Sequence, residues 1–434
     1  MNYSKLKLSK YVVFALNVSL FLLLIACKTK ENEVKPNQTP KKFEVFATIS
    51  DNVNSLSLRW DKSIDPDGDE VTYSVVYKDT LIRNLKDTNY IITNLPFATD
   101  IKGSIVAKDG KGGVTVSPFN AAILSEYINI PDVNFEKALI AGKIDDIVDG
   151  KILRSKVIPV RELNINHSST SGGKIQDLSG IESFINLLSL YCRSHNLIKL
   201  DMSNNTKLEQ LVCDSNRIVT LDVNRNTRLN RFYCSNNLLN RLDVTNNPEL
   251  EHLDCDSNEL TSLDISKNFK LISFSCSKNK LTNLDVDKNS VLKLLSCYSN
   301  ALTSLDLSKN LDLKVLLCSK NKLTDLDIGN NTKLISLWAD SNQLDKIDMT
   351  KNMNLENLVC NQNNLTNLDV TKNVSLNFIE CSFNKLTNLD VSKTANLTTL
   401  YCYGNTIQTI CVSNFSQVTT NWYKDPTATY KVCP

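Results

Sequence analysis

A repeat of 21 residues occupies the second half of this chain and constrains its fold more than any other feature. Its clearest marker is a ladder of ten cysteines that stand 21 residues apart, with one step of 42 residues at which Ala339 takes the missing position. The ladder consists of Cys192, Cys213, Cys234, Cys255, Cys276, Cys297, Cys318, Cys360, Cys381 and Cys402. Fixed repeats of this length indicate a solenoid, in which each unit stacks on its neighbours. Solenoids usually present binding surfaces, so the pattern favours recognition over catalysis.

Each unit reads L-x-x-L-x-C-x-x-N-x-L-x-x-L-D-V-S-x-N-x-x, and we expect the leucines and the cysteine to point inward. The asparagine that follows each cysteine by three residues can satisfy backbone groups at the turn and bond to the next coil. The two halves of the unit repeat nearly the same pattern in 10 and 11 residues. We therefore predict a mainly β solenoid of 21-residue coils, with two parallel β faces and few helices.

The cysteine ladder raises the alternatives of a metal site and of disulfides. Zinc sites need a local cluster such as C-x-x-C with histidine, whereas this ladder has one thiol per coil. Neighbouring rungs about 4.8 Å apart fall within disulfide range, but parallel side chains disfavour the required torsion. Buried free cysteine packs as a small hydrophobe, and alanine replaces it at one rung. The ladder is therefore predicted to be structural, with no metal and no cofactor.

The first residues read as a secretory leader. A basic start that includes Lys5, Lys7 and Lys10 is followed by an apolar run from Val12 to Ala26. The run ends at Leu24-Ile25-Ala26-Cys27, which resembles the bacterial lipobox. The resemblance implies a signal peptide over residues 1–26, lipidation of Cys27 and stable anchoring by several acyl chains. The alternative is an ordinary signal peptide with a chance cysteine.

Residues 27–41 are predicted to be the lipidated cysteine and a flexible polar tether. The acidic stretch Lys30-Glu31-Asn32-Glu33 is similar to surface-export signals of Bacteroidetes lipoproteins. We therefore expect an outer-membrane lipoprotein exposed at the cell surface, with the periplasmic face as the alternative.

Short alternating runs separated by turn residues predict an antiparallel β-sandwich over residues 42–122. The segment resembles a fibronectin type III domain, since Trp60 stands at the position of the buried early tryptophan and Leu95 precedes the later strand. It departs from that pattern at Ile101, where a tyrosine is usual.

An acidic loop lies within the predicted sandwich. Asp65, Asp67 and Asp69 alternate with proline and glycine, and such carboxylates can collect around calcium. The same residue types are also favoured in solvated turns, which is the plainer interpretation.

An atypical segment over residues 127–186 is predicted to cap the start of the solenoid, with a short helix after Pro131 and Asp132 as its N-cap. This cap and the repeats over 187–410 resemble the leucine-rich-repeat family, internalin-like in regularity and flavobacterial in type. The resemblance covers roughly residues 127–434. It implies the fold and a binding role, without identifying the ligand.

Cys411 and Cys433 lie outside the ladder and flank a non-repeating tail that contains Trp422 and Tyr423. Because the leader predicts export to an oxidising compartment, we predict a disulfide between these two cysteines. It would tie a C-terminal cap, residues 411–434, over the last coil.

A column of ten aspartates runs through the second half of the units, at 21-residue steps from Asp201 to Asp390. Such a column could bind calcium or a cationic partner. The favoured interpretation is structural, because Ser or Thr hydroxyls such as Ser266 and Thr350 can donate to the carboxylates and a lysine or arginine follows most of them by three residues.

Outward positions beside the cysteine ladder vary along the chain, as a recognition surface would. Aromatic residues are scarce in the repeats but gather at these positions. Exposed Tyr and Trp are frequent binding anchors and stack on sugars. The candidate surface is Tyr298, Trp338, Asp340, Tyr401 and Tyr403. The alternative is that aromatic residues simply favour strands.

Three functions compete. The favoured one is a non-enzymatic, membrane-anchored lipoprotein that binds a protein or glycan partner in adhesion or recognition. The second is a periplasm-facing scaffold lipoprotein. The third is an enzyme, which is disfavoured because the three histidines are scattered and no catalytic motif stands out. A formal net charge of +2 gives no basic footprint for nucleic acid.

Overall fold

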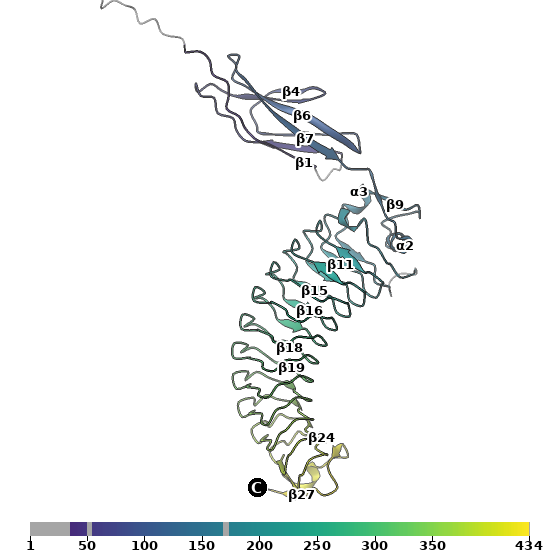
Figure 1. Ribbon diagram of the computed structural model, residues 1–434, viewed down its shortest axis with the longest axis vertical. Helices are drawn as coiled ribbons and strands as arrows, with labels where there is room; N and C mark the ends of the chain where they lie inside the picture. The colour runs from purple at the N-terminus through teal and green to yellow at the C-terminus, as the bar shows by residue number, and fades with distance from the viewer. Residues whose placement is uncertain (1–34, 50–53, 168–172, 434) are drawn as a thin grey trace, which may run out of the picture. The chain divides into compact units, whose positions relative to one another are not determined.

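A computed structural model describes residues 35–49, 54–167 and 173–433. The chain divides into two compact units, Met1–Leu124 and Ser125–Pro434 (Figure 1). Each unit has its own hydrophobic core. The predicted signal peptide and Cys27 lie outside the described residues. None of the helices within the described ranges has the length and apolar character needed to cross a bilayer.

The first unit is a sandwich of two antiparallel sheets. One sheet has the strand order β1-β2-β5 and the other the order β4-β3-β6-β7. Their bounds are β1 Val45–Ile49, β2 Leu56–Trp60, β3 Thr72–Tyr77, β4 Asp79–Leu85, β5 Asn89–Ile92, β6 Thr99–Lys108 and β7 Val114–Ile123. Alternate residues face inward, as in Leu56-Ser-Leu-Arg-Trp60, so the pattern of the sequence sets which face of each strand is buried.

Aromatic residues fill the centre of the sandwich. Trp60 and Tyr73 are buried and meet edge to face, with ring centroids 5.5 Å apart. The Tyr73 hydroxyl accepts a hydrogen bond from the Ser63 amide at 2.7 Å, which satisfies the buried phenol. Leu95 and Ile101 are also buried, so the aliphatic Ile101 is part of the core.

The end of the predicted tether differs from its sequence-based boundary at residue 41. Asn37 donates its side-chain amide to Asp109 at 2.7 Å, and Gln38 donates its backbone amide to Asp67 at 2.6 Å. Pro40 accepts a hydrogen bond from the hydroxyl of Thr115. Residues 37–40 therefore belong to the sandwich. Their polar composition suggested a solvated linker, but in the structure loop carboxylates satisfy their amides.

The second unit begins with the predicted cap. It contains β8 Tyr127–Asn129, α2 Val133–Ala141, β9 Lys151–Leu153, α3 Arg154–Val157, β10 Glu162–Asn164 and the 3-10 turn η2 Ile181–Ser183. The prediction that Asp132 caps α2 is confirmed, because its Oδ1 accepts the amides of Asn134 and Phe135. Its Oδ2 accepts the amides of Gln176 and Asp177. One carboxylate thus joins the helix to the first degenerate coil.

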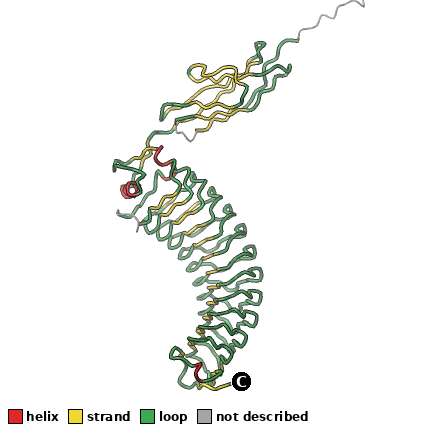
Figure 2. The backbone as a smooth tube through the Cα atoms, turned by 180° about the vertical axis from the view of Figure 1, so that it is seen from behind, coloured by secondary structure: helices red, strands yellow, loops and turns green. Residues whose placement is uncertain are grey.

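A parallel sheet of 13 strands runs through the solenoid, with its short strands stacked one above another (Figure 2). Eleven strands come from the predicted 21-residue units, and the caps add β10 at one end and β26 Trp422–Tyr423 at the other. The eleven are β11 Ser189–Tyr191, β13 Gln210–Val212, β15 Arg231–Tyr233, β16 His252–Asp254, β17 Ser273–Ser275, β18 Leu294–Ser296, β19 Val315–Leu317, β20 Ser336–Trp338, β21 Asn357–Val359, β22 Phe378–Glu380 and β24 Thr399–Tyr401. The predicted mainly β solenoid of 21-residue coils is confirmed.

The sequence predicts a second continuous parallel sheet on the opposite face of the coil, but the described residues form two short sheets there. Strands pair there only at the two ends of the described solenoid, as β12 Lys199–Asp201 with β14 Thr220–Asp222, and as β23 Asn388–Asp390 with β25 Thr409–Val412 and β27 Thr429–Val432. In the middle of the solenoid, successive coils are joined instead at the turn that precedes this face, as by Lys280 N to Leu260 O at 2.8 Å. One bond per coil satisfies part of the backbone without making a ladder.

Asparagines hold the coils together inside the solenoid. In the predicted column, the side-chain amide of Asn279 donates to Cys255 O and Cys276 O at 3.0 Å, and its oxygen accepts the Leu260 amide at 3.0 Å. A second buried column comes from the other asparagine of the unit, as in Asn289, which donates to Asn268 O at 2.9 Å. These amides replace water at turns that the solenoid buries.

At the C-terminal end, the turn η3 Phe415–Gln417 and strands β26 and β27 cover the last coil. Trp422 and Ala428 are buried there against the solenoid core. A disulfide joins Cys411 on β25 to Cys433, with the Cα atoms 5.4 Å apart. The exposed end of the leucine core is closed in this way.

Candidate binding surface

The 13-stranded sheet presents its variable residues to solvent because the strands alternate. In β20, Leu337 points into the core, while Ser336 and Trp338 point outward. Parallel pairing in register puts equivalent residues of successive coils in rows. Trp338 pairs with Val359, Val359 with Glu380, and Glu380 with Tyr401. The surface therefore consists of rows of outward-facing residues, and the residue type changes from one coil to the next.

The predicted aromatic residues do not form one compact patch. Trp338 has 47% of its surface exposed and lies three strands from Tyr401 in the same row. Tyr298 lies two coils before Trp338, where its ring is 5.7 Å from the ammonium of Lys278. Asp340, on the Trp338 coil, accepts a hydrogen bond from the hydroxyl of Ser341 at 3.1 Å.

Tyr401 and Tyr403 lie in a denser aromatic cluster at the C-terminal end of the sheet. The rings of Tyr401 and Tyr423 stack at 5.1 Å with 15° between their planes, and Phe378 lies 6.0 Å from Tyr401. Tyr403 meets Phe383 edge to face at 5.2 Å. We call these five residues the C-terminal aromatic cluster. Partly or fully exposed rings that pack against one another lose little entropy when they bind.

Sequence reasoning missed three members of this cluster. Phe378 stands on the other outward row of its strand, and Phe383 stands at a turn, with φ of 54°. Tyr423 comes from the non-repeating cap and pairs with Tyr401 after 22 residues instead of 21. The sequence feature that could have identified Tyr423 is the dipeptide Trp422-Tyr423, in which a buried residue precedes an exposed one as in the repeat strands.

Closer to the N-terminal end, the same sheet carries carboxylates. Asp214 is buried, pairs with Arg193 at 2.6 Å and accepts the hydroxyl of Ser235 at 2.9 Å. Asp254 and Asp256 follow two coils later on one strand and its turn, where Asp254 accepts the amide of Asp256 at 3.0 Å. Burial raises the pKa of Asp254 to about 6, and the charges of Asp256 and Asp214 add to the effect. This part of the sheet therefore concentrates negative charge.

Asp254 makes the stability of the solenoid depend on pH. An aspartate pKa of about 6 in the folded protein, against about 3.9 unfolded, stabilises the fold below pH 4, and this contribution is lost as pH rises through 6. We expect Asp254→Asn to raise the free energy of unfolding at pH 7 by about 1–2 kcal/mol and to flatten its pH dependence between 4 and 7. Urea denaturation at several pH values measures this. The exposed Asp325→Asn is the control, and equal curves for wild type and Asp254→Asn would refute the prediction.

The ten ladder cysteines are buried and unpaired. Burial raises the pKa of each, to about 12 at Cys297 and well above the ordinary value at Cys276. A protonated, shielded thiol is a poor nucleophile and a poor metal ligand. The ladder therefore contributes packing, in agreement with Ala339 at the missing rung.

The aspartate column on the opposite face has a local structural use. Asp348 accepts the amide and the hydroxyl of Thr350 at 2.9 and 2.7 Å, and Asp264 accepts the amide of Ser266 at 2.9 Å. These bonds lower the pKa of both aspartates, with a smaller contribution from Lys351 and Lys267. Each carboxylate thus stabilises the turn that follows it in the sequence.

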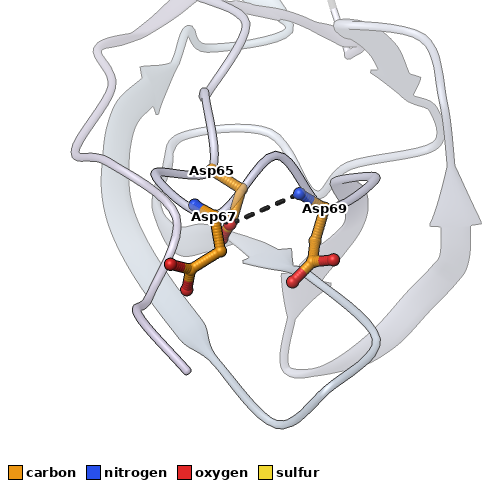
Figure 3. Close-up of side chains that lie close together, drawn as sticks. All are labelled: Asp65, Asp67 and Asp69. Atoms are coloured by element: carbon orange, nitrogen blue, oxygen red, sulfur yellow. Dashed lines mark hydrogen bonds between the residues drawn. The ribbon is translucent and has the colours of Figure 1, made fainter. Parts of the chain in front are cut away.

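In the first unit, Asp65, Asp67 and Asp69 lie together on the loop between β2 and β3 (Figure 3). One carboxylate oxygen from each lies within 4.8 Å of those of the other two. The turn requires Gly68, which has φ of +84°.

No protein-family model and no curated protein matches this chain. The chain is similar to the functional domain of InlJ from Listeria monocytogenes, which includes a cysteine ladder. The two are 27% identical with a TM-score of 0.54, over 69% of this chain and 80% of that one. An internalin, inlF, from the same species has 19% identity and a TM-score of 0.56, over 69% of this chain and 95% of that one.

The solenoid is a leucine-rich-repeat fold. Another solved structure with the same architecture is the ectodomain of the plant receptor kinase GASSHO1/SCHENGEN3 from Arabidopsis thaliana. It is 20% identical with a TM-score of 0.53, and the match covers 60% of this chain and 35% of that one. The InlJ domain includes a cysteine ladder, and a ladder of ten buried cysteines also runs through the present solenoid.

Proposed function

We propose that this protein is a non-enzymatic lipoprotein that displays the 13-stranded leucine-rich-repeat sheet as a surface for binding a protein partner. The observation that carries the proposal is the C-terminal aromatic cluster, which exposes Tyr423 to 52% beside the half-buried Tyr401 on a rigid sheet. Tyrosine and tryptophan on a rigid scaffold are the usual anchors of protein interfaces.

The comparisons support a recognition role. Internalin-type proteins are its structural neighbours, and the plant receptor ectodomain was solved in complex with CASPARIAN STRIP INTEGRITY FACTOR 2. The present sheet combines carboxylates near Asp254 with the aromatic cluster further along. A partner with a basic segment next to an apolar one would match both parts of this sheet.

We further propose that the sandwich is a fibronectin type III-like spacer between the anchor and the leucine-rich repeats. Its strand orders, β1-β2-β5 and β4-β3-β6-β7, support this, as does the buried Trp60. Lipidation at Cys27 is the proposed anchor, on the evidence of the sequence Leu24-Ile25-Ala26-Cys27. A periplasm-facing scaffold is the second candidate.

Binding is tested by screening the purified protein against panels of cell-surface proteins and glycans, followed by affinity measurements on the best ligand. We expect Trp338→Ala and Tyr401→Ala each to weaken binding at least tenfold, because truncation of an aromatic anchor removes about 2 kcal/mol or more. Phe269→Ala removes an exposed aromatic residue from a turn outside the sheet and should leave affinity unchanged. Wild-type affinity in Trp338→Ala and Tyr401→Ala would rule out the aromatic surface. If only glycans bind in the screen, the proposal of a protein partner is wrong.

Anchoring is tested by metabolic labelling with a fatty-acid analogue and by protease shaving of intact cells. Wild type should carry the lipid label and be cleaved at the surface, whereas Cys27→Ala should lose the label and leave the membrane fraction. A labelled protein that proteases reach only after the outer membrane is broken would support the scaffold function. An unlabelled wild-type protein would refute the lipid anchor.

A further inference from the structure

We propose that Asp65, Asp67 and Asp69 form a calcium site that fastens the start of the sandwich to two of its loops. The inference is independent of the proposed binding function. Among the residues that the structure describes, these three form the one group with metal-ligand spacing. The loop that carries them runs from the end of β2 to the start of β3.

The decisive observation is a buried carboxylate oxygen that has no partner. Asp65 has only 5% of its surface exposed, and its Oδ1 accepts the amides of Asp67 and Asp69 at 2.8 and 3.5 Å. No described residue donates a hydrogen bond to its Oδ2, and the buried Oδ2 of Asp69 is equally without a donor. An anionic oxygen removed from water without a donor or a cation is strongly destabilised. Figure 3 shows the Asp65 carboxylate pointing into the loop between Asp67 and Asp69.

The irregular set of oxygen ligands fits calcium better than magnesium, which requires a nearly ideal octahedron. Calcium binds oxygens at about 2.3–2.6 Å, so two ligands on opposite sides of the ion lie up to about 5 Å apart. Magnesium binds at about 2.0–2.1 Å, so its opposite ligands lie only about 4 Å apart. The oxygens of Asp65, Asp67 and Asp69 lie within 4.8 Å of one another, so a single ion can reach all three. Calcium also accepts irregular geometry, with water filling the open positions on the exposed side of Asp67.

Local charge favours a divalent cation. Asp109 lies on the loop between β6 and β7, and the ammonium of Lys111 on that loop contacts Asp69 at 2.7 Å while also interacting with Asp67 and Asp109. Three carboxylates thus share one ammonium. The Lys111 side chain is 65% exposed, so it can move away from Asp69 when a calcium ion enters.

The surrounding contacts indicate what the ion would do. Gln38 donates its backbone and side-chain amides to Asp67 at 2.6 and 3.0 Å, and Asn37 donates to Asp109 at 2.7 Å. Three segments far apart in the sequence, residues 37–38, 65–69 and 109–113, therefore meet around the carboxylates. A calcium ion bound to Asp67 fixes the oxygens that hold Gln38. The site would strengthen the point at which the N-terminal segment joins the folded sandwich.

The experiment is calorimetric titration of the chelator-treated full-length protein with calcium chloride and, separately, magnesium chloride. We expect one calcium ion per chain, weaker magnesium binding, and a rise in the unfolding midpoint of the sandwich on the order of 10 °C at a calcium concentration about 100 times Kd. Asp65→Asn should weaken calcium binding at least tenfold. Asparagine retains the oxygen that accepts the two loop amides, so this variant keeps the turn. Asp87→Asn, at an exposed turn of the same unit, is the matched control.

Lys111→Met tests whether calcium or the Lys111 ammonium is the cation that neutralises these carboxylates. If calcium binds here, Lys111→Met should bind it as tightly as wild type or more tightly, because a competing cation is removed. Absence of calcium binding by both wild type and Lys111→Met would overturn the proposal and leave Lys111 as the sole counter-charge. Equal binding by Asp65→Asn and wild type, or equal affinity for magnesium and calcium, would also overturn it.

Discussion

Asn279→Ala is expected to lower the free energy of unfolding of the solenoid by about 3 kcal/mol. The substitution leaves the carbonyls of Cys255 and Cys276 and the amide of Leu260 without their partner in the interior. Each buried polar group left unsatisfied costs about 1–3 kcal/mol, and relaxation of the coil reduces the total. Urea denaturation followed by far-ultraviolet circular dichroism measures the change.

The control for this variant is Asn283→Ala, four residues further along the same coil, where the asparagine is exposed. It should alter stability by less than about 0.5 kcal/mol. Each coil contacts only its neighbours, so Asn279→Ala should weaken the coupling between the coils on its two sides. The urea unfolding transition should therefore become broader. Similar stability of the two variants would show that water replaces the Asn279 amide.

Loss of the disulfide between Cys411 and Cys433 is expected to destabilise the C-terminal cap by about 3 kcal/mol. The bond joins residues 22 apart. A cross-link that closes a loop of this length lowers the entropy of the unfolded chain, which stabilises the folded state by about this amount. Cys411→Ser with Cys433→Ser should expose the last coil. Hydrogen exchange should then rise in β24 and β26 before it rises in the central strands.

Reductant provides the control for the disulfide. Wild type treated with dithiothreitol should match the double variant, and the double variant should not respond to dithiothreitol. The ten buried thiols should not contribute, since each is shielded in the core. No effect of dithiothreitol on wild-type hydrogen exchange would contradict a stabilising role of the bond. Loss of the cap would also displace Tyr423 and so weaken binding at the aromatic cluster.

The regular part of the molecule was predictable because its contacts are local. The 21-residue period places Leu253, Phe274 and Leu295 above one another in register, as the parallel pairing shows. The asparagine column followed from the same reasoning, since a buried amide has to meet the backbone of the next coil. The N-cap at Asp132 was predictable from a short local signal.

The candidate binding surface was less predictable. Row positions such as Trp338 and Tyr401 follow from the repeat, but Tyr423 stacks on Tyr401 only because the cap pairs with β24 after an irregular step of 22 residues. The raised pKa of Asp254 depends on its burial and on charges from two coils, which a linear pattern does not show. Residues 37–40 were predicted to be linker, because their partners lie on two loops and on strand β7, up to 75 positions away.

The sequence by itself determined the solenoid, its period, the inward leucines and cysteines, and the column of asparagines that follows the cysteines. These features repeat, and each coil needs only its neighbours to form. The tertiary structure alone decided which aromatic rings meet, how far the second sheet extends, and that three separated segments gather around Asp65, Asp67 and Asp69. Those features depend on contacts between non-repeating segments, for which burial and pairing, rather than a local pattern, select the partners.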